Sequence, residues 1–331
     1  MLSLILTVCA LLSLLPSLFA CGRSKGDDGK ISIVCTIFPQ YDWVRALVGD
    51  DERYSVTLLI DNGSDVHSYQ PTVADRVEIA ECDILVTLGG QSDAWVADMA
   101  NGSDAQVISL SDISGITLRR VDTEGILSEH IHGEHEHEDH GHAEGSHEGH
   151  DHGAYDEHIW LSLRNAAICV NYLAMRISEL TPDASAEIER RRDEYISRLH
   201  ELDAELSALA KGASAHGLLI ADRFPFVYLT SDYSIEYCAA FEGCTTESNA
   251  DFDTVTRLAE RANEWKAKYI IVTETSDERL ASSVIAASGR EDLEVLRLDS
   301  MQSVTRARIS NGESYISVMR KNLETLRTAL S

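Results

Sequence analysis

Basic residues are scarce in this sequence. Its 331 residues include 28 Lys and Arg against 55 Asp and Glu, which gives a formal net charge of −27. A surface of that charge repels phosphate backbones and anionic lipid headgroups, so nucleic acid and anionic lipid surfaces are excluded as partners. A cationic ligand is compatible with the same charge.

The sequence also lacks the motifs of common hydrolases. It contains neither HExxH nor GxSxG, and the nearest text, HEHEDH, does not place two His on one helical face. A zinc hydrolase is the alternative from the enzyme class, because catalytic zinc keeps an open position for water beside three protein ligands. We expect a protein that is not an enzyme.

Charge is missing from the N-terminus as well. Residues 1–20 are uncharged and apolar, and Cys21 follows them directly. Ala20 before this Cys and Leu18 three positions ahead of it resemble the lipobox of bacterial lipoprotein signal peptides. We expect a signal peptide over 1–20, a lipid on Cys21 and a spacer over 21–29, with an uncleaved anchor as the alternative. Both place the remaining chain outside the cytoplasm, tethered to a membrane.

Cysteine does not occur in a metal-binding or fully paired pattern. The chain has seven Cys and no CxxC. Cys9 lies in the predicted signal peptide and Cys21 carries the predicted lipid, so an odd number remains and complete pairing is precluded. Cys238 and Cys244 lie closest together and could form a disulfide in an oxidising compartment. Unpaired buried Cys is the alternative.

Histidine, in contrast, is concentrated in one segment. Nine of the 13 His lie between residues 129 and 153, interleaved with Asp, Glu and Gly: His130, His132, His135, His137, His140, His142, His147, His150 and His152. Imidazoles and carboxylates without a competing Lys or Arg are typical of a metal-binding tract. The segment has no apolar period, so we expect a loop that contacts metal. A solvated acidic linker is the alternative.

Short apolar strands alternate with amphipathic helices on both sides of this segment. We expect strands at KISIVC, RYSVTLLI, DILVTL and AQVISL, and again at GLLIAD, KYIIVTE and LEVLRLD. The alternation predicts mostly parallel sheets covered on both faces, which bind ligands beyond the carboxyl ends of their strands. Between the two sets of strands, apolar residues recur at helical spacing as far as about Lys211. We therefore expect an α/β protein with two doubly wound lobes, 30–181 and 214–331, joined by one long rigid helix over 182–213.

Three segments carry a resemblance to a known family. Bacterial zinc/manganese solute-binding proteins, the metal-binding lipoproteins that act as receptors of ABC importers, have a first-lobe signature similar to GSDVHSYQPTVADRVEIAECDILVTLGGQSDAWV. Their second signature resembles DEHIWLSLRNA, and their C-terminal helix resembles GESYISVMRKNLETL. The likeness covers nearly the whole chain after Lys30. It implies a metal site in the cleft between the lobes.

The resemblance also implies metal ligands. His67 and His158 match the two His that bind metal in the family, and each lies in a loop beside a predicted element. Asp299, after the last strand, matches the family's fourth ligand. Glu274 matches a recurrent family position, and we expect it to line the cleft or to orient a ligand.

The third ligand stays open. Zinc members of the family carry a His after the first strand of the second lobe, manganese members carry a Glu, and this chain reads GLLIADRFPFVYL there. Asp222 is the candidate carboxylate, whereas a shift of one residue in the alignment would place Ala221 at that position. In the alternative interpretation, Asp222 pairs with Arg223 or caps the next helix.

Two imidazole ligands favour Zn²⁺, and the same set of ligands binds zinc more tightly than manganese. We expect a high-affinity extracytoplasmic zinc receptor, monomeric, that delivers the ion to an ABC permease and its ATPase, with the His-rich loop as an auxiliary capture site. A Mn²⁺ receptor of the same family is one alternative. A surface zinc buffer, which would bind mainly through the His-rich loop, is another.

Overall fold

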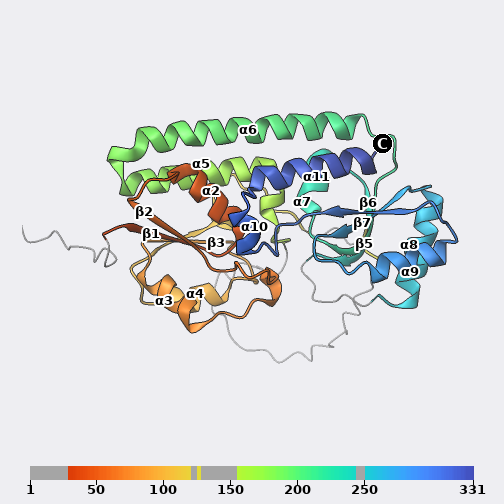
Figure 1. Cartoon of the computed structure of the whole chain (residues 1–331), viewed down its shortest axis with the longest axis horizontal. Coiled ribbons are helices and arrows are strands. Elements are labelled where there is room, and N and C mark those ends of the chain that lie inside the picture. Colours follow the sequence, from red (N-terminus) through yellow and green to blue (C-terminus); the bar gives the residue numbers. More distant parts are fainter. Residues whose placement is uncertain (1–28, 121–124, 128–154, 244–249) are drawn as a thin grey trace, which may run out of the picture.

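Two α/β lobes lie side by side in the computed structural model, each built on a four-stranded sheet (Figure 1). The structure describes residues 29–120, 125–127, 155–243 and 250–331. The expected fold class, two parallel-sheet lobes joined by one long helix, is confirmed. Among the described residues, no helix has the length and apolar character needed to cross a bilayer.

The N-terminal lobe is built on a parallel sheet with strand order β2-β1-β3-β4. Its strands are β1 (Ile31–Cys35), β2 (Tyr54–Leu58), β3 (Ile84–Thr87) and β4 (Gln106–Ser109). Its helices are α2 (Phe38–Val48), α3 (Val73–Glu81) and α4 (Trp95–Ala100). Helix α2 ends as expected at Gly49, whose φ of 62° favours glycine. Because the strands are parallel, the loops that follow β2 and β3 lie at one edge of the sheet.

The C-terminal lobe repeats this architecture with strand order β6-β5-β7-β8, again parallel. Its strands are β5 (Leu218–Phe224), β6 (Tyr237–Glu242), β7 (Tyr269–Thr273) and β8 (Glu294–Leu298). Its helices are α7 (Val227–Tyr233), α8 (Phe252–Glu264), α9 (Arg279–Ser288) and α10 (Arg306–Ser310). Helices α8 and α9 pack on the sheet and on each other.

Three long helices lie along one side of the molecule (Figure 1). They are α5 (Leu163–Leu180), α6 (Ser185–Lys211) and α11 (Tyr315–Ala329), and Figure 1 shows α6 extending over both lobes. The last helix of the chain, α11, packs against α2 of the N-terminal lobe as well as against α6 and β8. There the rings of Trp43 and Tyr315 meet edge to face, with centroids 5.3 Å apart. One continuous hydrophobic cluster therefore crosses from lobe to lobe, which limits how far they can separate.

The structure differs from the sequence-based expectation in the second lobe and at the start of the linking helix. The second lobe contains α7, the strand β6 and the short helix α10, none of which was expected. Strand β6 reads YCAAFE, and its two central alanines lack the β-branched signal that marks the other strands. The linking helix α6 begins at Ser185, after the short 3-10 turn Pro182–Ala184, rather than directly at Pro182.

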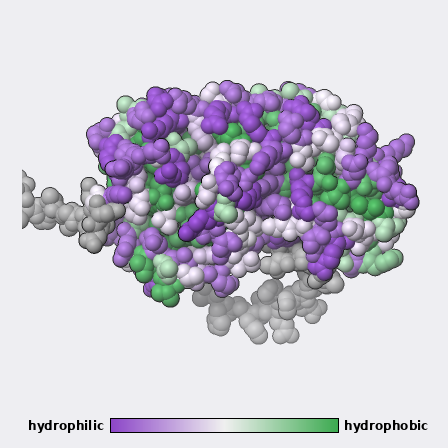
Figure 2. All heavy atoms as spheres, viewed as in Figure 1, coloured by the Kyte–Doolittle hydropathy of each residue, from purple (hydrophilic) through white to green (hydrophobic). Residues whose placement is uncertain are grey.

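The face of the molecule shown in Figure 2 is mostly hydrophilic, with small hydrophobic patches between polar side chains. Buried apolar residues form the two core clusters instead, a large one shared by both lobes and a smaller one under α8 and α9. Apolar packing thus holds the lobes together. Polar side chains lie at the edges of the sheets, where the strands end.

Candidate metal centre

The two predicted His ligands lie on short turns that face each other. His67 sits in the 3-10 turn Val66–Ser68, which follows β2, and the Asp65 side chain caps this turn by accepting the His67 N–H at 2.9 Å. His158 directly precedes the 3-10 turn Ile159–Leu161 and is fully buried. The Nε2 atoms of the two imidazoles are 3.1 Å apart.

This spacing suits one tetrahedral zinc ion. Zn–N bonds of ~2.0–2.1 Å at the tetrahedral angle place two nitrogens about 3.3 Å apart. The observed separation of 3.1 Å is close to that value. Both imidazoles can therefore bind the same ion with small side-chain movements.

A hydrogen-bonded carboxylate orients each imidazole. Asp156 Oδ1 accepts from Nδ1 of His158 at 2.8 Å, so Nε2 of this ring carries a lone pair. Nδ1 of His67 lies 2.8 Å from Ser92 Oγ, and that hydroxyl donates to the carboxylate of Glu157. The Ser92 oxygen must then accept a hydrogen bond from Nδ1–H of His67. The proton of this neutral ring is therefore on Nδ1, and Nε2 of His67 also carries a lone pair. Two lone pairs that converge in this way are satisfied by a shared cation.

The environment of the pair keeps the His67 imidazole neutral. Burial, followed by the nearby His158, lowers the pKa of His67 from 6.5 to about 4, and the Arg223 guanidinium acts in the same direction. The charges of Asp65 and Glu157 oppose this change without reversing it. A neutral imidazole is the form that binds a metal ion.

Elements of the C-terminal lobe hold the segment that carries His158. Tyr228 of α7 donates its hydroxyl hydrogen to the Asp156 carbonyl at 2.6 Å. Tyr315 of α11 does the same to the Trp160 carbonyl at 2.6 Å, and the Trp160 indole N–H donates to the Ser300 carbonyl at 2.8 Å. His158 is thus fixed at the interface of the lobes, within reach of both.

Asp222, the predicted third ligand, lies in β5 and lines the same cavity as His67. Its Oδ1 accepts the Arg223 backbone N–H at 2.8 Å. Its Oδ2 accepts the backbone N–H and the hydroxyl of Thr273 at 3.1 and 2.8 Å. The carboxylate therefore joins β5 to β7.

Asp299 and Glu274, the other two predicted carboxylates, lie next to each other after β8 and β7. Asp299 Oδ1 accepts the Met301 N–H at 2.8 Å, and its other oxygen pairs with Arg308. Glu274 accepts the backbone N–H and the hydroxyl of Ser300 at 2.9 and 2.8 Å. Burial raises the pKa of Glu274, and the negative charge of Asp299 raises it further.

Within the part of the chain that the structure describes, no three His, Cys, Asp or Glu side chains form a group that could hold a metal ion. The structure brings His67 and His158 together but leaves Asp222 and Asp299 with other partners. Instead, Arg223 of β5 reaches across the cleft to Asp65, with an N–O distance of 2.7 Å. The cleft cavity beside His67 has a volume of about 550 Å³.

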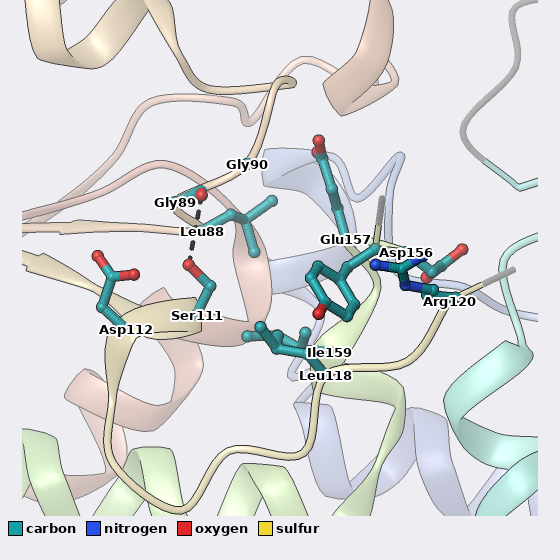
Figure 3. Close-up of a pocket in the computed structure, with 11 residues that line it drawn as sticks. Leu88, Gly89, Gly90, Ser111, Asp112, Leu118, Arg120, Asp156, Glu157 and Ile159 are labelled. Atoms are coloured by element: carbon teal, nitrogen blue, oxygen red, sulfur yellow. Dashed lines mark hydrogen bonds between the residues drawn. The ribbon is translucent and has the colours of Figure 1, made fainter. Parts of the chain in front are cut away.

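A second cavity, of about 260 Å³, adjoins the residues that precede His158 (Figure 3). Asp156 and Glu157 line it, together with apolar side chains such as Leu88, Leu118 and Ile159. Ser111 closes one side by donating to the Gly89 carbonyl at 3.3 Å (Figure 3).

Sequence reasoning missed the groups that orient the imidazoles. Asp156 and Glu157 are adjacent to His158 in the text DEH, and this adjacency was an available signal. Ser92, in GGQSDAW, gave no such signal because it contacts His67 only in the folded chain. Arg223 likewise gave none, since its partner Asp65 belongs to the other lobe.

Several predicted features lie outside the described residues. These are the signal peptide 1–20, Cys21 and the nine His of the loop 129–153. Of the predicted disulfide, Cys238 is a buried free thiol, and Cys244 also lies outside the described part. These features stay predictions.

Two solved structures have the same fold. The Zn(II)-bound ZnuA-like domain of Streptococcus pneumoniae AdcA aligns with a TM-score of 0.68 and 24% identity, over 91% of this chain and 99% of that one. The metal-dependent lipoprotein YcdH from Bacillus subtilis aligns with a TM-score of 0.71 and 23% identity, over 91% and 100% of the two chains. Likeness at this level of identity establishes the fold.

Relatives with similar sequences are zinc-binding proteins by name. The zinc-binding lipoprotein AdcA of Streptococcus pneumoniae is 29% identical over 327 residues, which cover 98% of this chain and 60% of AdcA. The high-affinity zinc uptake system protein ZnuA of Bacillus subtilis is 28% identical over 321 residues, 94% of this chain and 93% of that protein. The chain thus spans about 60% of the length of the AdcA relatives.

The family model described as zinc-uptake complex component A, periplasmic, matches residues 33–329. This match covers both lobes, the linking helix and both His of the facing pair. It confirms the resemblance that the three sequence signatures indicated. The chain belongs to the family of the periplasmic component A of zinc-uptake complexes.

Proposed function

We propose that this chain is an extracytoplasmic receptor that binds zinc between its lobes and delivers it to an ABC importer. The observation that carries the proposal is the convergence of the His67 and His158 Nε2 atoms, which lie 3.1 Å apart. In each ring the Nδ1 atom is held by a hydrogen bond, to Ser92 for His67 and to Asp156 for His158. Imidazole nitrogen suits zinc better than manganese. The names of the AdcA and ZnuA relatives point the same way.

Asp222 and Asp299 are the proposed additional ligands, and each would have to exchange its present partners for the metal. Asp222 would release Thr273, and Asp299 would release Arg308. Glu274 supports the turn that carries Asp299 by holding Ser300, so its proposed role is to orient that ligand. Because a shared hydrophobic cluster joins the lobes, we propose that the ion is released through small shifts of one lobe.

The remaining parts of the proposal concern segments outside the described residues. A lipid on Cys21 would tether the receptor to the membrane, facing away from the cytoplasm. The His-rich loop 129–153 would collect zinc at the mouth of the cleft. The loop re-enters the described chain at Tyr155, three residues before His158, which supports transfer from one to the other. A permease and its ATPase would receive the ion.

Calorimetric titration with zinc, and then with manganese, tests the proposal. The proteins are the intact chain, a deletion of 129–153, and His67→Ala and His158→Ala in the deletion background. His200→Ala, which changes an exposed His of α6, is the matched control. We expect one tight zinc site that survives the deletion and His200→Ala but disappears with either cleft substitution. If zinc binding disappears with the loop alone, the chain is a zinc buffer or a receptor for another metal.

A further inference from the structure

The Glu157 carboxylate, one residue before His158, is enclosed by the loop that follows β3. Its Oε1 accepts the Gln91 backbone N–H at 2.5 Å, and its Oε2 accepts the Ser92 hydroxyl. The Ser92 backbone N–H lies 3.1 Å from Oε2 and 3.3 Å from Oε1. A Cβ atom at Gly90 would lie 2.6 Å from Oε1, so the carboxylate fits because residue 90 is a glycine. Figure 3 shows the Glu157 side chain extending toward Gly90.

A second carboxylate shapes the same loop without help from Glu157. Asp93 is buried, and it accepts the backbone N–H groups of Leu88, Gly89 and Gly90 at 2.5, 3.2 and 3.3 Å. These bonds hold the loop in its turn whether or not Glu157 is in place. Substitutions of Glu157 therefore change what Ser92 contacts while the loop itself stays folded.

The direction of the hydrogen bonds from Glu157 to His67 follows from the chemistry of the three groups. An ionised carboxylate can only accept, so the Ser92 hydroxyl donates to Glu157. The Ser92 oxygen then accepts from Nδ1 of His67, 2.8 Å away. Without an acceptor of its own, the same hydroxyl could equally donate to Nδ1, because a hydroxyl is both donor and acceptor. Ser92 alone thus leaves the His67 tautomer open, and Glu157 fixes it.

We propose that Glu157 is a positioning residue that sets the tautomer of His67 through Ser92 and so makes this imidazole able to bind zinc. The inference rests on the proposed function and adds a control on the same site. With Glu157 in the loop, the His67 proton is on Nδ1 and the Nε2 lone pair faces His158. With Glu157 displaced, Ser92 donates to Nδ1, the proton is on Nε2, and that nitrogen has no lone pair for a metal ion.

Two substitutions should reverse or release this chain of hydrogen bonds. Glu157→Gln keeps the size of the side chain. Its single amide oxygen can take both backbone N–H groups, which leaves the amide NH₂ to donate to the Ser92 oxygen and turns the hydroxyl toward Nδ1 of His67. Gly90→Ala keeps the carboxylate and its charge but pushes it out of the loop.

Nitrogen–proton correlation spectra of the imidazoles test the inference in the zinc-free full chain labelled with ¹⁵N-histidine. These spectra distinguish a proton on Nδ1 from one on Nε2, and the signals of His67 are those that His67→Ala removes. The zinc affinity of the same proteins is measured by competition with a chromophoric chelator. The variants are Glu157→Gln, Gly90→Ala, Ser92→Ala and the double variant of Ser92→Ala with Glu157→Gln. Glu189→Gln, an exposed glutamate of α6, is the matched control, and thermal unfolding checks that each variant is folded.

We expect the His67 proton on Nδ1 in the intact chain and in Glu189→Gln, and on Nε2 in Glu157→Gln. Gly90→Ala should lose the fixed Nδ1 tautomer as well. Zinc affinity should fall about 10- to 100-fold in Glu157→Gln and Gly90→Ala. In the Ser92→Ala background, Glu157→Gln should have no further effect on zinc affinity, because the group that connects it to His67 is gone.

An unchanged His67 tautomer in Glu157→Gln overturns the inference. Equal losses of zinc affinity on Glu157→Gln with and without Ser92 also overturn it, because Glu157 would then act as a remote charge. In both cases the proposed function stands as long as His67→Ala loses the tight zinc site. If His67→Ala binds zinc as tightly as the intact chain, the proposed function fails, whatever the tautomer of His67.

Discussion

The imidazoles of His67 and His158 face each other beside the lobe interface, with their Nε2 atoms 3.1 Å apart. They come from turns separated by 91 positions in sequence, one following a strand of the N-terminal lobe and the other held by helices of the C-terminal lobe. This relationship joins the fold to the proposed function, because two oriented lone pairs at that distance form half of a tetrahedral zinc site.

Asp156→Asn should weaken zinc binding about 10- to 100-fold while leaving the fold intact. The amide keeps an oxygen near Nδ1 of His158 but removes the negative charge that makes the ring a stronger donor. Calorimetry in the loop-deleted chain measures the effect. Asp193→Asn, an exposed aspartate of α6, is the control and should leave the zinc affinity unchanged. Equal affinities for the two variants would show that Asp156 does not act through His158.

Tyr228→Phe should lower the free energy of unfolding by about 1–3 kcal/mol, because a buried carbonyl of the segment before His158 loses its donor. Zinc affinity should fall with it, since that segment positions the imidazole. Urea unfolding and zinc titration measure the two effects. Tyr172→Phe, which changes a half-buried tyrosine of α5, is the control. An unchanged unfolding free energy for Tyr228→Phe would show that the Tyr228–Asp156 hydrogen bond does not stabilise the fold.

Several ion pairs cross between the lobes, and two of them, Asp65–Arg223 and Asp61–Arg306, should differ in strength. The Asp65–Arg223 pair is mostly buried, with 15% and 20% of the side chains exposed, whereas Arg306, which pairs with Asp61, is 80% exposed. Double-mutant cycles on unfolding should give about 1–3 kcal/mol of coupling for the first pair. The second should give ~0.2–1 kcal/mol, because solvent screens it. Equal coupling energies would show that burial does not set their strength.

Asp93 should make stability fall as the pH rises from about 4 to about 6. Burial raises the pKa of its carboxyl from 3.8 to about 6, against the opposing effect of the Leu88 and Gly89 N–H groups. The folded chain therefore binds more protons than the unfolded chain between these two values, and stability present below pH 3.8 is lost as the pH rises through 6. The loss is at most about 3 kcal/mol. Carboxyl carbon NMR should give a midpoint near 6, and a midpoint near 3.8 would contradict it.

The sequence was sufficient to predict both parallel sheets apart from strand β6, because strands and helices depend on local patterns, and the family resemblance pointed to His67 and His158. Strand composition and strand–helix alternation mark the sheets, and His67 and His158 lie in recognisable signatures beside them. The contacts of Asp222 were not predictable in this way. Its carboxylate bonds to Thr273, 51 positions away, and only the pairing of β5 with β7 brings the two together.

The orienting groups of the site show the same limit. Asp156 lies two positions before His158 in sequence, so its contact is local. Ser92 contacts His67 only because the loops that follow β2 and β3 lie at the same edge of the sheet. Arg223 meets Asp65 only because the lobes face each other. Features that depend on the relative placement of lobes have no short-range signal along the chain.

X-ray absorption at the zinc edge tests the central claim most directly. The sample is the chain without residues 129–153, loaded with one equivalent of zinc, alongside His67→Ala and His158→Ala. We expect two imidazole nitrogens at ~2.0–2.1 Å in the parent and one in each variant that still retains the metal. A parent spectrum without imidazole scattering, or one unchanged in both variants, would contradict the assignment of His67 and His158 as a shared zinc site.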